Sequence, residues 1–241
     1  MTTSSKRPAA WDEHETPTDE TVNVEVLLEV RKALATGGGV TDAEFDAVYP
    51  RKVQARSSQF WTPFAIARRA AELLVVDRST HVLDVGSGVG KLCIVGAATT
   101  GARFTGIEHR GSLVRIARKA AETYGVRGTR FIAAPMQSIR WAAFDAFYLF
   151  NPFAENAFGV DEQLDRTVEL SRARYFSDIA FVEEMLTTAP VGARVLTYHG
   201  FGGAMPNTYQ PVLRERIGTD ALELWLKTRA FTFATPRAAN D

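Results

Sequence analysis

An apolar segment, residues 82–85, runs into alternating glycines at 86–90 and then into a second apolar run with helical character. A buried strand that breaks into glycines and continues as a helix is typical of the first βα turn of a nucleotide-binding sheet, because missing Cβ atoms let a ligand approach the backbone. The helix N-terminus then faces that ligand. Glu108 ends the next predicted strand, 103–108, at the distance where an acid accepts hydrogen bonds from ribose hydroxyls. The pattern predicts a nucleotide site at the carboxyl edge of a sheet.

The spacing of this turn distinguishes between ligand classes. A P-loop needs Gly-x-x-x-x-Gly-Lys-[Ser/Thr], but Val85 stands at its first glycine position and Leu92 follows Lys91. A dinucleotide turn places its third glycine three residues after the second, whereas the glycines here alternate. A nicotinamide-dependent oxidoreductase is therefore disfavoured.

Asp84, the alternating glycines and the acid at 108 together resemble motif I and the following acidic position of class I S-adenosylmethionine (SAM) dependent methyltransferases. The resemblance covers roughly residues 59–235. It implies an enzyme with SAM as cofactor, whose backbone turn lies under the amino-acid end of SAM and whose Asp84 meets the ammonium group or a loop amide. The cofactor residues that it implies in this part of the chain are Asp84, Gly86, Ser87, Gly88, Gly90 and Glu108.

The stretch after the third predicted strand departs from this family. Many members carry an acid there that accepts the adenine amino group, but residues 133–137 read Ala-Ala-Pro-Met-Gln. We expect adenine to be held by Met136 against its face and by a backbone group.

Asn151, Pro152 and Phe153 follow the fourth predicted strand, 146–150, where the family binds the methyl-bearing sulfonium. They resemble the Asn-Pro-Pro-Phe/Tyr signature of amine-methylating enzymes, and 151–159 is similar to a segment of Dot1 lysine methyltransferases. The resemblance implies that the Asn151 side-chain oxygen and the next backbone carbonyl accept the hydrogens of a target amine. An Asx-Pro turn that merely ends a strand is the competing interpretation.

Residues 59–63, Gln-Phe-Trp-Thr-Pro, resemble the Phe-x-Thr-Pro segment that opens the SAM site of many adenine-N6 methyltransferases. The resemblance adds Phe60 and Thr62 to the cofactor residues. Thr62 is also expected to cap a helix whose first residue is Pro63. An ordinary helix start with aromatic anchors is the alternative.

Other polar residues carry weaker signals. His199 follows the fifth predicted strand in a glycine-rich loop and is a candidate to face the substrate, or else part of a turn. The four histidines and Cys93 show no metal-site spacing. Positive charge near the expected entrance, either for an anionic substrate or as a solvated face, comes from Arg51, Lys52, Arg56, Arg68 and Arg69.

The surrounding elements predict an α/β, doubly wound fold. Residues 1–21 are expected to be a disordered tail, 22–76 an N-terminal helical lid, and 77–241 the SAM-binding methyltransferase domain. Within that domain strands and helices alternate, which predicts a mostly parallel sheet. Runs at 222–227 and 231–235 suit a C-terminal antiparallel hairpin, and the family resemblance implies seven strands in all.

Composition limits the partners. Formal net charge is zero, so nucleic acid is possible but not indicated, and no apolar run approaches membrane-spanning length. We expect a cytoplasmic SAM-dependent methyltransferase of unknown oligomeric state. Its acceptor is expected to be a nitrogen on a protein side chain, a nucleic-acid base or a small molecule, and a non-catalytic SAM-binding protein of the same fold is the alternative.

Overall fold

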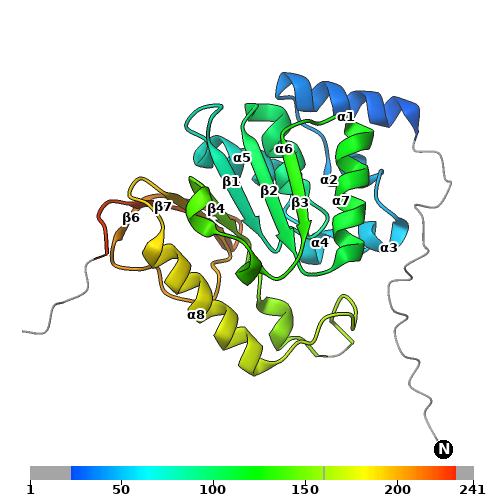
Figure 1. Ribbon diagram of the computed structural model, residues 1–241. Helices are drawn as coiled ribbons and strands as arrows, with labels where there is room; N and C mark the ends of the chain where they lie inside the picture. The colour runs from blue at the N-terminus through cyan, green and yellow to red at the C-terminus, as the bar shows by residue number, and fades with distance from the viewer. Residues whose placement is uncertain (1–22, 160, 232–241) are drawn as a thin grey trace, which may run out of the picture.

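The computed structural model describes residues 23–159 and 161–231, and the predicted tail at 1–21 lies outside them. Its centre is a seven-stranded sheet in the order β3-β2-β1-β4-β5-β7-β6. β1 to β5 are parallel and β7 runs antiparallel to β5, so the carboxyl ends of five strands meet at one edge, the lower edge in Figure 1. The strands are His81–Val85 (β1), Arg103–Glu108 (β2), Thr129–Ala133 (β3), Ala146–Leu149 (β4), Arg194–Tyr198 (β5), Tyr209–Ile217 (β6) and Asp220–Lys227 (β7).

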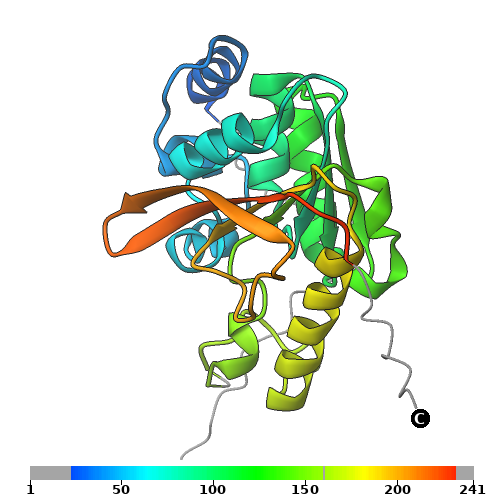
Figure 2. The same cartoon turned by 90° about the vertical axis from the view of Figure 1, so that its left-hand side faces the viewer.

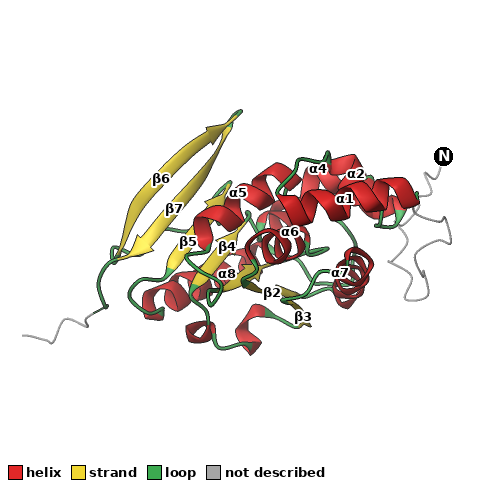
Figure 3. Cartoon of the chain, turned by 90° about the horizontal axis from the view of Figure 1, so that it is seen from above, coloured by secondary structure: helices red, strands yellow, loops and turns green. Residues whose placement is uncertain are grey.

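Helices cover both faces of the sheet, which confirms the doubly wound α/β prediction (Figure 3). One apolar cluster joins α1, α5, α6 and α7 to one face, and a second joins α8 to the other. The longer helices are Val24–Thr36 (α1), Phe64–Leu74 (α5), Lys91–Thr100 (α6), Gly111–Tyr124 (α7) and Arg172–Thr188 (α8). The shorter ones are Asp42–Asp46 (α2), Arg51–Gln54 (α3) and Ser57–Phe60 (α4), with 3-10 turns at Met136–Ser138 (η1), Trp141–Ala143 (η2) and Ala154–Ala157 (η3).

Lys91, the first residue of α6, holds the N-terminal helices against the glycine turn. Its side chain is 2% exposed, and its Nζ lies 2.7 Å from carboxylate oxygens of both Asp42 and Asp46. The Tyr49 hydroxyl donates to the Val89 carbonyl at 3.3 Å, next to this ion cluster. The helices before β1 are therefore bonded to the turn itself. The predicted boundary between a lid at 22–76 and the domain after it stays a prediction.

The predicted start of α5 is wrong. Pro63 is the N-cap residue, the helix begins at Phe64, and the Thr62 side chain makes no capping hydrogen bond. Asp42 Oδ1 instead accepts from the Phe64 N–H at 2.8 Å, because α2 packs close enough to supply the cap from another element. The Thr62 hydroxyl points into the core and hydrogen-bonds the Tyr148 hydroxyl at 3.2 Å.

The C-terminal hairpin exists, but its strands differ from the predicted pair. β7 pairs with β5 on one side and with β6, at 209–217, on the other. Of the predicted partner run 231–235, residues 232–235 lie outside the described residues. β6 lies at the sheet edge, where residues 210–212 are all exposed and Pro211 has no N–H to donate, so the first half of its sequence does not alternate like a buried strand. Figure 2 shows the hairpin, in orange, extending from the body.

Candidate functional site

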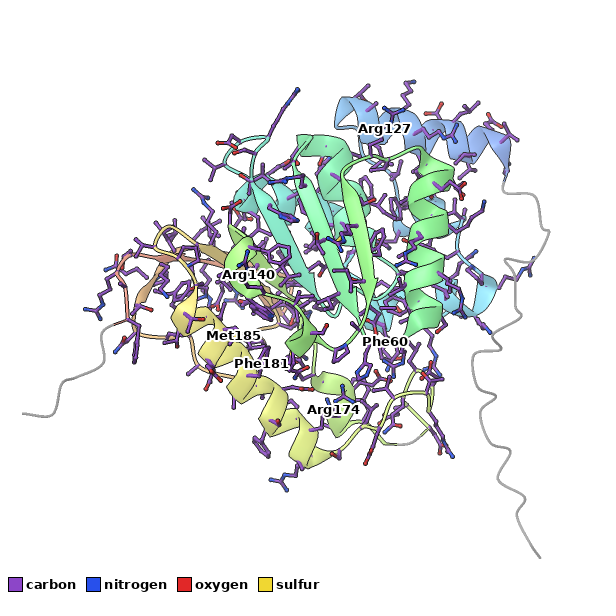
Figure 4. All side chains as sticks on the ribbon, in the orientation of Figure 1. Phe60, Arg127, Arg140, Arg174, Phe181 and Met185 are labelled. Atoms are coloured by element: carbon purple, nitrogen blue, oxygen red, sulfur yellow. The ribbon has the colours of Figure 1, made fainter. Side chains whose placement is uncertain are left out.

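A cavity of about 330 Å³ lies at the carboxyl edge of the parallel strands. Phe60 from α4 and Arg174 from α8 both lie at this edge, on opposite sides of the sheet (Figure 4). The sequence-predicted residues that line the cavity are Phe60, Gly86, Gly88, Glu108, Met136, Asn151, Pro152 and Phe153. Thr62, Asp84, Ser87 and Gly90 lie behind its wall.

The glycine turn has the backbone that the sequence predicts. Gly88 has φ +52°, in the left-handed region, and a Cβ built on it would stand 2.6 Å from the Trp61 ring. Gly86 has φ +73°, and its added Cβ would come within 3.2 Å of Pro152. A side chain at either position would push away the aromatic wall or the segment after β4. The turn therefore brings bare backbone to the floor of the cavity.

Glu108 fastens this turn to the end of β2. Its Oε2 accepts from the Gly88 N–H at 3.0 Å and its Oε1 from the Arg110 N–H at 2.8 Å. Burial raises the pKa of Glu108, and the two backbone donors and the nearby Arg110 charge act against that rise. A carboxylate has about four acceptor positions, so it can still accept hydrogen bonds from hydroxyls in the cavity.

Asp84 and Ser87 support the turn from behind. The Asp84 Oδ2 accepts from the Cys93 Sγ at 3.5 Å, and burial raises the pKa of Asp84 to about 7. The Ser87 hydroxyl is buried without a hydrogen-bond partner in the described part of the chain, and it faces Gly106 of β2. The expected contact between Asp84 and a cofactor ammonium group stays a prediction.

At the β2–β3 end of the cavity, where the third strand is followed by no acid, α8 contributes a polar network. The Gln137 Nε2 donates to Asp178 Oδ1 at 3.1 Å, and Arg174 Nε donates to Asp178 Oδ2 at 3.2 Å. The Arg174 NH2 group also donates to His109 Nδ1 at 2.6 Å. Met136 lines the cavity beside this network, and its expected contact with adenine stays a prediction. Asp178 and Arg174 are not among the residues predicted from the sequence, because they lie on a helix remote in the chain.

A buried arginine pairs with the segment that follows β4. Arg110 Nε donates to Asp165 Oδ1 and its NH2 group to Glu155 Oε1, both at 2.9 Å. Glu155 Oε1 also accepts from the Leu164 N–H at 2.6 Å. The side chains of Arg110, Glu155 and Asp165 are at most 13% exposed, so the contacts hold Glu155 and Asp165 against the end of β2. The sequence gives no signal for this pairing beyond an arginine two residues after Glu108.

At the β4–β5 end, Asn151 and His199 follow neighbouring parallel strands. They are the non-glycine residues with positive φ in the described ranges, at +37° and +59°. The Asn151 N–H donates to the Gly200 carbonyl at 2.9 Å, so the two strand ends are bonded to each other. Left-handed backbone on residues with a Cβ is uncommon and is concentrated at functional sites.

Aromatic rings enclose this end of the cavity. The Phe60 ring lies 5.8 Å from the Trp61 ring and 6.1 Å from that of Phe158, and the Phe150 ring lies 5.3 Å from that of His199. All five residues line the cavity. This half of the site can hold a flat, apolar group beside a few polar atoms.

The basic residues predicted near the entrance, Arg51, Lys52, Arg56, Arg68 and Arg69, do not line the cavity. Arg68 donates to the carbonyls of Gly37 and Gly38, and Arg69 pairs with Glu215 of β6, so neither lines the cavity. Within the described residues, no group of three or more His, Cys, Asp or Glu side chains is arranged to hold a metal ion. No helix there is long and apolar enough to cross a membrane.

Comparisons with known proteins agree with this geometry. Residues 82–173 match a family described as a methyltransferase domain. A search of curated proteins finds no matching sequence. Among solved structures, an RNA methyltransferase from Salinibacter ruber in complex with S-adenosyl-L-homocysteine superposes with a TM-score of 0.52 at 22% identity, over 75% of this chain and 99% of that one. TrmN from Thermus thermophilus superposes with a TM-score of 0.53 at 18% identity, over 73% of this chain and 52% of that one. At these identities the structural likeness establishes the fold.

Proposed function

We propose that this chain is a class I SAM-dependent methyltransferase and that it transfers the methyl group of SAM to the exocyclic amine of a base in RNA. The observation that carries the proposal is Asn151, held with φ +37° at the cavity end of β4 and followed by Pro152. The proposal covers both the acceptor and SAM as the methyl donor.

The residues at the cavity floor fit SAM. Glu108 has acceptor positions left for ribose hydroxyls, and the open backbone at Gly86 and Gly88 has room for the amino-acid end. Met136 and the network around Asp178 border the space for adenine. When bound, SAM supplies an electrophilic methyl group, so the protein mainly has to position and orient the acceptor.

Asn151 and Pro152 offer two acceptors for an amine. No hydrogen bond within the described residues reaches the Asn151 carboxamide or the Pro152 carbonyl, although both residues line the cavity. Two oxygens that accept the two N–H hydrogens of an amine turn its lone pair toward the methyl group. A hydrogen bond aligned in this way contributes most when the charge on nitrogen changes.

The aromatic wall supports a base as the group that carries the amine. Phe60 and Phe158 form an edge-to-face pair at the acceptor end, and an unstacked base gains roughly 1–3 kcal/mol from stacking on an aromatic side chain. Sequence-specific recognition of RNA relies on bases extruded in this way. The fold shared with the Salinibacter ruber RNA methyltransferase is consistent with this substrate class.

The test is a labelling experiment with the full chain. We expect radiolabelled-methyl SAM to label total cellular RNA, and mass spectrometry of the nuclease digest to find the methyl group on an exocyclic nitrogen. Parallel reactions contain total protein or the small-molecule fraction. Label confined to protein or small molecules would overturn the RNA assignment, and a methyl group on oxygen or carbon would overturn the nitrogen assignment.

A further inference from the structure

His109 and His199 line the cavity, and their hydrogen-bond partners decide whether Nδ1 of each ring carries a proton. The guanidinium of Arg174 can only donate, so His109 Nδ1 must accept from it at 2.6 Å, which uses the ring's lone pair. His199 Nδ1 instead lies 2.9 Å from Asp220 Oδ1. A carboxylate can only accept, so His199 carries its proton on Nδ1, and the neutral ring keeps a free lone pair on Nε2.

His199 is also placed beside the proposed amine site. β4 and β5 are parallel with Leu149 opposite Thr197, so two residues further on Asn151 and His199 occupy equivalent positions at the strand ends. Both line the cavity, and the N–H bond from Asn151 to the Gly200 carbonyl ties the two ends together. The His199 ring is packed 4.3 Å from that of Tyr198 and 5.3 Å from that of Phe150, which restricts its orientation.

We infer that His199, oriented by Asp220, is the proton acceptor of the methyl transfer; this role rests on the proposed function. The amine lone pair forms the new N–C bond, the C–S bond breaks, and its electron pair remains on sulfur. The nitrogen then carries one proton too many. His199 Nε2 takes that proton, and the resulting imidazolium is stabilised by Asp220 across the Nδ1–H hydrogen bond.

The cavity's carboxyl groups are engaged elsewhere, which favours His199 for this role. Glu155 pairs with Arg110, and Asp178 pairs with Arg174. Glu108 accepts two backbone N–H groups at the opposite end, over β2. Around His199 itself, the charged or titratable neighbours within the described residues are Asp220 on β7 and Tyr198 on β5.

The inference is tested by single-turnover methylation of total RNA at saturating SAM. His199→Gln keeps a polar side chain but offers no basic nitrogen, and we expect its rate to fall about 100-fold with unchanged affinity for S-adenosyl-L-homocysteine. Asp220→Asn is expected to lose about 10-fold, because the amide does not stabilise the imidazolium. His81→Gln is the matched control: its ring bonds Thr105 and does not line the cavity, so the transfer rate should equal the parent rate.

Chemical rescue separates a base from a structural residue. His199→Gly leaves space for a free imidazole and tolerates the left-handed backbone, so its rate should rise with added imidazole, whereas that of Asn151→Ala should not. A parent-like rate in His199→Gln, or no rescue of a folded, cofactor-binding His199→Gly, would overturn the role of His199 alone. Absence of any labelling by the unmodified protein would overturn the proposed function, and this inference with it.

Discussion

Asn151 is the residue whose replacement best separates acceptor orientation from cofactor binding. Asn151→Ala removes a carboxamide without a partner in the described structure and leaves Glu108 and the glycine turn in place. We expect SAM affinity to persist and the single-turnover rate to fall by at least about 100-fold, as when one well-placed hydrogen-bonding group is lost from a reaction centre. Calorimetric titration and rapid-quench kinetics measure the two quantities.

Asn156 provides the comparison for that experiment. It also lines the cavity, but its Nδ2 donates to the Phe153 carbonyl at 3.1 Å and its Oδ1 accepts from the Ser171 N–H at 3.2 Å. Asn156→Ala should therefore lower the melting temperature. If Asn151→Ala showed that same loss of stability and only a proportional loss of activity, Asn151 would be a turn residue.

Glu108 is expected to control cofactor affinity. Glu108→Gln exchanges one carboxylate oxygen for an NH₂ group, which only donates, so one backbone N–H and any ribose hydroxyl bound on that side lose their acceptor. We expect SAM to bind about 10- to 100-fold more weakly, the range that corresponds to about 1.4–2.8 kcal/mol. Undiminished affinity in a titration would show that ribose is bound elsewhere.

Asp84 should make stability depend on pH. Burial raises its pKa from 3.8 to about 7, so the native state keeps a proton that the unfolded chain releases between about pH 4 and 7. The free energy of unfolding therefore falls as pH rises through this window. Above the window Asp84 is ionised in both states and adds no further pH dependence. In Asp84→Asn the fall from pH 4.5 to 8 should be smaller by roughly 2–4 kcal/mol, measured by urea unfolding at both values. An identical pH dependence in the two proteins would contradict this assignment.

At the scale of elements, the ion cluster around Lys91 decides whether the N-terminal helices stay attached. Lys91→Met removes the cation between Asp42 and Asp46 and leaves Asp46 buried without its charge partner. The expected loss is about 3–5 kcal/mol of unfolding free energy, measured by urea titration.

Lys119→Met is the control for that substitution. Lys119 pairs with Glu122 on the surface of α7, and both side chains are more than half exposed. Its replacement should change stability by less than about 1 kcal/mol. Equal losses in the two variants would show that the buried Lys91 cluster contributes no more to the free energy of unfolding than an exposed ion pair.

The sequence predicted best those elements whose pattern depends on their own residues. β2 and β3 have their predicted bounds, because nearby glycines and helix patterns in the sequence mark where each strand begins and ends. The capping box at Thr41 is present for the same reason. The cap of α5 was missed because it comes from Asp42, 22 residues earlier, and β6 was missed because an edge strand needs no alternating pattern.

The residues of the site also fall into those that local motifs predict and those that they do not. The glycine turn and Glu108 are local motifs, and they line the cavity where the pattern placed them. The Arg110 pairs with Glu155 and Asp165 span 45 and 55 residues, and no periodicity in the sequence connects them. These long-range polar pairs therefore could not be predicted from the sequence and are seen only in the structure.

For the whole molecule, ligand binding and folding should be coupled. The cavity joins the N-terminal helices, the carboxyl ends of the five parallel strands and α8, so a ligand there contacts parts that separate only on unfolding. S-adenosyl-L-homocysteine at 100 times its Kd should stabilise the native state by about 2.7 kcal/mol. We expect a rise in melting temperature in scanning calorimetry; NAD at the same concentration should give none, and a shift with NAD instead would contradict the cofactor assignment.

Trp61 is placed so that its fluorescence can report on ligand binding. Its indole Nε1 donates to the Val53 carbonyl in the N-terminal helices, while its ring lies against Gly88 in the turn. A ligand on the turn changes the polarity around this ring. The indole is therefore a fluorescent reporter at the contact between the N-terminal helices and the glycine turn. Tryptophan emission should shift on cofactor addition, and Trp61→Phe should abolish the shift, since among the described residues Trp141 and Trp225 do not line the cavity; Trp11→Phe, outside the described residues, is the control.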